Sequence, residues 1–191
     1  MTTDMKTGDF SKMYMEEKKQ SEVKEATGLP LALNIGCGLV HHDFIGYKTF
    51  NVDVRTEAGP DIVADVLSLP FDPESIDLIY NKEVMEHLSR NDVITALKHW
   101  RSLLKPGGKL ITIVPDLEVA AIELLSGNTT GATWDILYGA QNYPENFHKH
   151  GHTNKSLKAM LEKFGFDIES VECKDRLITC ISYKSEEVYH G

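Results

Sequence analysis

The chain has 191 residues, 41% hydrophobic and 26% charged, a composition typical of one globular domain with a sizeable core. Its 29 acidic and 20 basic residues give a net charge of −9, which argues against general nucleic-acid binding because that needs a basic face. The three cysteines have no paired spacing, and the chain shows neither a signal peptide nor an apolar run long enough to span a membrane. We expect a cytoplasmic monomer or homodimer without membrane insertion.

The predicted elements begin with a helix. Helix formers dominate residues 9–26, and we expect an N-terminal helical segment over residues 1–28 that is either loosely anchored or a lid over a cofactor. A single domain over residues 29–191 should follow it. Short apolar runs in that domain predict strands at 31–35, 50–54, 61–66, 75–81 and 109–115. Helical spacing of apolar residues predicts helices at 93–104, 116–125 and 156–164.

The order of these elements predicts the fold class. Strands that alternate with helices indicate a doubly wound α/β fold around a mostly parallel sheet. Residues 167–173 and 177–183 can form an antiparallel C-terminal hairpin, which brings the sheet to seven strands. Residues 126–153 remain as a long irregular stretch, and long loops of this kind in compact domains tend to be functional.

The first strand ends in a glycine loop that suits a nucleotide-like ligand. Gly36 and Gly38 let the backbone turn tightly and approach a ligand closely. Asp53 ends the neighbouring strand, where its carboxylate can accept hydrogen bonds from a ribose diol. No third glycine follows at the place expected for a dinucleotide site, and residues 39–50 are too short for a full crossover helix that would present its N-terminus to a pyrophosphate. This favours an adenosine-containing cofactor without phosphates, such as S-adenosylmethionine, over a nicotinamide dinucleotide.

Two further polar residues are expected at the same edge of the sheet. Asp65 ends the third strand, where it can accept a hydrogen bond from an adenine amino group with Val66 and Leu67 beside the ring, or act as an N-cap or turn residue instead. Asn81 ends the fourth strand. Three polar strand ends on one edge suit a shared ligand better than three separate caps.

These features together resemble the Rossmann-like (class I) S-adenosylmethionine-dependent methyltransferases, especially small bacterial type-11-like members. The resemblance covers about residues 31–173. It rests on LNIGCG, FNVDV, DIVADVLSLPFDPESIDLIYN, VMEHL, LKHWRSLLKPGGKLITIVPDL and LKAMLEKFGFDIESV, in the family's order. Two departures stand out: Asn34 replaces the commoner acid, and the loop from Leu39 to Phe50 is short.

The resemblance implies a set of cofactor-binding residues. Asn34, Gly36, Cys37 and Gly38 would cradle the amino-acid part of the cofactor. Asp53, followed by Val54, would hold the ribose. The remaining members would lie against adenine or near the acceptor: Asp65, Val66, Asn81, Lys82, Glu86 and His87.

The piece NFHKHGHT carries the candidate catalytic residues, because histidine titrates near neutrality. His148, His150 and His152 alternate there, which permits a metal site, a solvated polar loop, or substrate binding and general-base catalysis. Alternation alone does not converge three ligands, and no carboxylate or cysteine stands at a ligand spacing, so we expect no metal. We choose His148 first and His150 second as catalytic residues.

The sequence therefore predicts a methyltransferase that moves a methyl group from S-adenosylmethionine, with S-adenosylhomocysteine as product. The acceptor is expected to be an oxygen or nitrogen of a small-molecule or glycan-type compound, because little of the chain is left for a separate recognition domain. The alternative is a non-catalytic S-adenosylmethionine-binding protein that regulates or scaffolds a partner.

Overall fold

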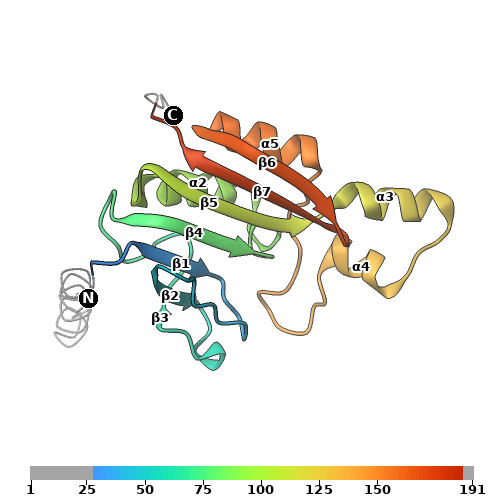
Figure 1. The fold of residues 1–191 in the computed structure, drawn as a ribbon. Helices are drawn as coiled ribbons and strands as arrows, with labels where there is room; N and C mark the ends of the chain where they lie inside the picture. The colour runs from blue at the N-terminus through green and yellow to red at the C-terminus, as the bar shows by residue number, and fades with distance from the viewer. Residues whose placement is uncertain (1–27, 187–191) are drawn as a thin grey trace, which may run out of the picture.

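The structure is a computed structural model that describes residues 28–186, so the predicted helix and lid within residues 1–28 fall outside the described part. Seven strands form one sheet in the order β3-β2-β1-β4-β5-β7-β6 (Figure 1). Their bounds are Leu31–Ile35 (β1), Lys48–Asp53 (β2), Ile62–Val63 (β3), Ile76–Lys82 (β4), Leu104–Pro115 (β5), Phe166–Lys174 (β6) and Leu177–Lys184 (β7). Strand β7 is antiparallel to both neighbours, and the other described pairings are parallel. The predicted fold class is confirmed.

The helical elements lie between and beside these strands. Two short 3-10 helices span Thr56–Ala58 (η1) and Met85–His87 (η2). The α-helices span Arg90–Leu103 (α2), Leu117–Ser126 (α3), Gly131–Tyr138 (α4) and Asn154–Lys163 (α5). None of the helices in residues 28–186 combines the length and the apolarity that crossing a membrane requires.

Strand β1 lies at the centre of the parallel part of the sheet. Every residue of its sequence LALNI is buried, as expected of a strand with neighbours on both sides. It pairs in parallel with β2 and β4. The residues that follow the carboxyl ends of β1, β2 and β4 are therefore brought to one edge, where doubly wound sheets bind ligands.

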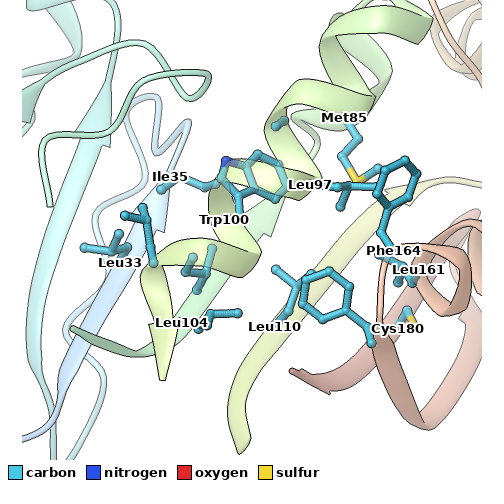
Figure 2. Packing of buried hydrophobic residues seen from close by; sticks show 14 of the residues in the cluster. Leu33, Ile35, Met85, Leu97, Trp100, Leu104, Leu110, Leu161, Phe164 and Cys180 are labelled. Carbon is cyan, nitrogen blue, oxygen red and sulfur yellow. The ribbon is translucent and has the colours of Figure 1, made fainter. Parts of the chain in front are cut away.

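The core joins the sheet to α2 and α5. Figure 2 shows Leu33 and Ile35 of β1, Trp100 of α2 and Leu161 of α5 within one cluster of buried side chains. Trp100 is fully buried, and its indole N–H donates to the carbonyl of Val66 at 2.8 Å. The core thus holds the segment after β3 in place beside the ligand edge.

Local signals explain where α2 and α5 begin and end. Ser89 and Asp92 form a capping box at the start of α2, and Thr153 caps α5 in the same way with Ser156. Such caps satisfy backbone N–H groups that a helix leaves without partners. Gly165 follows α5 with a φ of +76°, as expected of a glycine just beyond a helix.

Two expectations about secondary structure were wrong. The strand expected at 109–115 begins earlier, at Leu104, and so includes Pro106, Gly107 and Gly108. The pairing of β5 with β4 shifts register between Ile76 and Leu78, so the Pro-Gly-Gly residues form an irregularity within the strand. The stretch 126–153 was expected to be irregular, but it contains α4, whose apolar residues show little helical periodicity.

Candidate active site

A pocket opens at the carboxyl ends of β1, β2 and β4. Its volume is about 460 Å³, which is within the usual range of roughly 300–1,000 Å³ for small-ligand sites. The lining residues come from the glycine loop, the ends of β2 and β3, the region of η2 and the segment after α4. They are Gly36, Gly38, Asp53, Val54, Arg55, Asp65, Val66, Leu67, Glu83, Val84, His87, Leu88, Asp92, Tyr143, Pro144, Glu145 and Lys149.

Gly36 lines this pocket, and only glycine fits at its position. Its φ is +61°, and a Cβ at this position would lie 2.5 Å from Cγ2 of Val84. A larger residue would meet both the backbone strain and the steric clash. The glycine loop therefore runs directly over Val84, with its backbone next to the pocket.

Asp53 ties the glycine loop to the end of β2. Its carboxylate accepts the backbone N–H of Gly38 at 2.8 Å and the backbone N–H of Arg55 at 2.9 Å. The residue is 5% exposed. A nearly buried carboxylate that lines a pocket and is oriented by two backbone donors is well placed to accept further hydrogen bonds from a ligand hydroxyl.

Arg55 connects Asp53 to the segment after α4. Its Nε lies 3.3 Å from Oδ1 of Asp53, and its guanidinium carbon lies 4.2 Å from the ring centre of Tyr143. Cation–aromatic contacts of this kind are attractive. The Arg55–Tyr143 contact therefore holds residues 143–145 beside the pocket.

The segment after β3 forms another part of the pocket wall. Asp65 is exposed and accepts the backbone N–H of Leu67 at 2.9 Å, which is the arrangement of a turn residue. Val66 and Leu67 contribute apolar surface beside it. A carboxylate next to an apolar wall can bind a flat, polar-edged ring such as adenine.

The structure brings together seven of the predicted cofactor-binding residues in the pocket wall: Gly36, Gly38, Asp53, Val54, Asp65, Val66 and His87. The other predicted residues do not line it: Asn34, Cys37, Asn81, Lys82, Glu86, His148 and His150.

The Asn34 side chain is hydrogen-bonded both to the loop after β1 and to β2. Its amide donates to the carbonyl of Val40 at 3.1 Å and to the side chain of Asn51 at 2.8 Å. Asn34 and Asn51 are register partners in β1 and β2, so both side chains are on the same face of the sheet. The short loop is thus held to the sheet by amide side chains, and this explains an asparagine where an acid is commoner.

Cys37 is buried within the glycine loop. Burial, reinforced by the nearby Asp53 carboxylate, raises the pKa of its thiol to about 11. Its Sγ lies 3.4 Å from the carbonyl of Gly38. The neutral thiol therefore serves as a small packing group under the loop.

Asn81 and Lys82 contact neighbouring protein residues and do not line the pocket. The Asn81 amide donates to the carbonyl of Ile111 and to the hydroxyl of Thr112, each at 3.0 Å. These bonds link β4 to β5 beneath the site. Lys82 is exposed and lies 3.6 Å from the Glu83 carboxylate.

Several pocket residues were missed from the sequence: Arg55, Glu83, Val84, Leu88, Asp92, Tyr143, Pro144, Glu145 and Lys149. Arg55 and Glu83 each come just after a strand that the sequence assigns to the site, so extending each strand end by two residues would have included them. Glu83 also has a φ of +55°, which is strained for a residue other than glycine and is often found at functional sites. The residues from 143 to 149 belong to the long stretch that was expected to be functional.

Behind the pocket wall, Glu86 and His87 of η2 meet His148. The backbone N–H groups of Lys149 and His150 both donate to the carbonyl of Glu86, at 2.7 and 3.1 Å, which fixes this segment against η2. The rings of His87 and His148 are 4.9 Å apart. Burial raises the pKa of the Glu86 carboxyl to about 8 and, with the proximity of His148, lowers the pKa of His87.

His150 faces the other way, toward His152. Their ring centres are 4.4 Å apart. Burial lowers the pKa of His150, with a smaller contribution from Arg90. His152 is 1% exposed, and burial followed by the nearby His150 lowers its pKa to about 4. The two candidate catalytic histidines therefore belong to different pairs, and His148 is the one in contact with a pocket residue.

Comparison with known proteins identifies the class. A family model described as a methyltransferase domain matches residues 16–171, and the chain belongs to that family, as the sequence indicated. A protein of Encephalitozoon cuniculi that is provisionally named a methyltransferase is 33% identical over 135 residues. That match covers 58% of this chain and 64% of the relative's own length.

Solved structures share the fold at low sequence identity. An S-adenosylmethionine-dependent methyltransferase from Methanosarcina mazei has a TM-score of 0.64 and 20% identity, covering 82% of this chain and 93% of its own. The 1,6-didemethyltoxoflavin-N1-methyltransferase of Burkholderia thailandensis, solved with its substrate and S-adenosylhomocysteine, has a TM-score of 0.60 and 15% identity. It covers 94% of this chain and 84% of its own. These neighbours confirm the Rossmann-like class I methyltransferase fold.

Proposed function

We propose that this protein is an S-adenosylmethionine-dependent methyltransferase. One observation carries the proposal: in a member of the methyltransferase-domain family, the glycine loop is bonded to Asp53 and both line one pocket. The cofactor, when bound, supplies a methyl group on a positively charged sulfur. The residues present suit it, because Gly36 leaves the pocket free of a Cβ that would strike Val84.

Each part of the cofactor has a partner in the pocket. The backbone around Gly36 and Gly38 would approach the amino-acid part, and Asp53 would accept hydrogen bonds from the ribose. Asp65 and Val66 would contact adenine. Asn34 and Cys37 act from behind the loop, as their contacts support. We propose no direct cofactor contact for Asn81 or Lys82.

The proposed acceptor is an oxygen or nitrogen atom of a small-molecule or glycan-type compound. The pocket is lined on its outer side by polar residues such as Glu145 and Lys149, which suit a small polar acceptor. A protein of the same fold, named as an N1-methyltransferase and solved with the small molecule 1,6-didemethyltoxoflavin, supports the same class. Methyl transfer needs in-line alignment of the acceptor, and a hydroxyl acceptor must also lose its proton.

Among the two predicted catalytic histidines, we favour His148 for activating the acceptor. Its ring contacts His87, which lines the pocket, whereas His150 contacts the buried His152. We place the protein in the cytoplasm, since Cys37, Cys173 and Cys180 are all unpaired thiols and unpaired thiols are typical of a reducing compartment. The monomer or homodimer remains our proposal for its assembly.

Calorimetric titration with S-adenosylhomocysteine tests the cofactor proposal. We expect saturable one-site binding. Asp53→Asn should weaken it roughly 10- to 100-fold, because hydrogen bonds to a charged acceptor contribute about 1.5–3 kcal/mol. The matched control is Asp72→Asn, at an exposed aspartate outside the pocket, which should leave the affinity unchanged.

Two outcomes would contradict the proposal. No binding by folded, ligand-free protein would remove the cofactor assignment, and equal affinity of both variants would remove the role of Asp53. Transfer of a radiolabelled methyl group to a panel of hydroxyl and amine metabolites then separates an enzyme from the alternative, a non-catalytic S-adenosylmethionine-binding regulator or scaffold.

A further inference from the structure

Three potential metal ligands converge beside the pocket. Glu86 and His87 come from η2, and His148 comes from the segment after α4. One ligand atom from each residue lies within 4.8 Å of the other two. The carboxylate that the sequence pattern lacked is thus supplied from a distant part of the chain.

The Glu86 carboxylate is buried without a partner. The residue is 1% exposed, and neither of its carboxylate oxygens has a hydrogen-bond partner among residues 28–186. A carboxylate in this position is costly unless another group compensates for the lost hydration. A cation held between the three side chains would provide that compensation.

Backbone carbonyls fix the protonated nitrogen of both histidines. The Nδ1 atom of His148 lies 2.8 Å from the carbonyl of Ile136, and the Nδ1 atom of His87 lies 3.3 Å from the carbonyl of Phe147. A carbonyl can only accept, so each Nδ1 must carry the proton, which leaves the lone pair on Nε2. Backbone carbonyls commonly fix ligating histidines in this way.

We propose that Glu86, His87 and His148 form a binding site for a divalent first-row transition cation of the Zn²⁺ type. Two imidazole nitrogens and one carboxylate oxygen suit such a cation, whereas Mg²⁺ and Ca²⁺ prefer oxygen ligands alone. Three protein ligands leave a coordination position open for water or for another oxygen. The proposal replaces the expectation of no metal, which considered only the alternating histidines.

The location of this site suggests its use. His87 both belongs to the cluster and lines the pocket, so a cation there would lie beside a bound acceptor. A cation makes a nearby hydroxyl more acidic, so His148 would activate a hydroxyl acceptor through the cation and not as a base. This use rests on the proposed function, but the site itself does not.

Calorimetric titration of the tag-free full chain with Zn²⁺ tests the site, and absorption spectra with Co²⁺ report the ligand set. We expect one site in the unmodified protein. Glu86→Gln, which keeps the side chain's shape, should lower the Zn²⁺ affinity at least about tenfold, and His148→Gln should do the same. His150→Gln is the matched control from the same segment and should retain the affinity.

The outcomes separate this inference from the proposed function. Protein that binds S-adenosylhomocysteine but not Zn²⁺ would overturn the metal site alone, and protein that binds Zn²⁺ but not S-adenosylhomocysteine would overturn the cofactor proposal alone. Unchanged Zn²⁺ affinity in folded Glu86→Gln, or a loss confined to His150→Gln, would also overturn the assignment.

Discussion

At the scale of single residues, Gly36 affects both the stability of the glycine loop and the shape of the pocket. Gly36 is constrained twice, by a φ of +61° and by Val84, whose Cγ2 would lie 2.5 Å from any Cβ added there. Gly59 has a nearly identical φ of +63°, but nothing lies within 4 Å of its Cβ direction. Alanine substitutions at the two positions would share the cost of backbone strain, but only the substitution at Gly36 would also clash with Val84.

We predict that Gly36→Ala destabilises the protein more than Gly59→Ala. The left-handed backbone costs a residue with a Cβ about 1–2 kcal/mol, and crowding at Val84 should add roughly 1–3 kcal/mol in Gly36→Ala only. Urea unfolding of both variants measures the difference. Equal losses would show that Val84 moves aside freely, and the loop would then not be rigidly seated.

At the scale of elements, the segment after α4 completes the site. It reaches η2 through backbone hydrogen bonds to Glu86 and reaches β2 through the stacking of Tyr143 on Arg55. Residues distant in sequence thus line one pocket. The contact with Arg55 is the part of this arrangement that a single substitution can remove.

We predict that Tyr143→Ala speeds the release of S-adenosylhomocysteine. A half-buried cation–aromatic contact such as Arg55–Tyr143 contributes about 0.5–1 kcal/mol, which corresponds to roughly a two- to fivefold faster dissociation. Stopped-flow displacement measures the rate. The control is Tyr138→Ala, at an exposed tyrosine that stacks on Trp134 and does not line the pocket. A similar acceleration in the control would assign the effect to general loosening of the segment.

Sequence patterns predicted the part of the site at the ends of β1 and β2 better than the part formed by residues 143–149. The apolar run before Gly36 predicted β1, and alternation of strands and helices placed Asp53 at the ligand edge, because these features depend on short-range periodicity. Residues 143–149 have no such periodicity, and their position depends on tertiary hydrogen bonds to η2. The approach of His148 to Glu86 could not be predicted for the same reason.

At the scale of the whole molecule, His152 links folding to pH. It is buried, neither ring nitrogen has a hydrogen-bond partner within residues 28–186, and its pKa falls from 6.5 to about 4. Between these values the unfolded chain binds a proton at this residue and the folded chain does not. The contribution of His152 to stability therefore decreases as the pH falls from about 6.5 to about 4, by an amount on the order of 3 kcal/mol.

We predict that His152→Gln reduces this acid sensitivity. Urea unfolding at pH 7 and at pH 4.5 should show a smaller loss of stability in the variant than in the unmodified protein, by about 2 kcal/mol. His41→Gln, at an exposed histidine, controls for the removal of one imidazole and should follow the unmodified protein. Parallel losses in all three proteins would mean that His152 does not control the transition.

The strand order has a consequence for biosynthesis. Strand β7 is the last described strand, yet it lies between β5 and β6 (Figure 1). While the ribosome is still translating residues before Leu177, β5 has no partner on that side, and its backbone groups and apolar residues such as Leu110 and Val114 remain open to other chains. A stalled or truncated product would therefore be a target for chaperones and prone to aggregate, although it carries the whole cofactor edge.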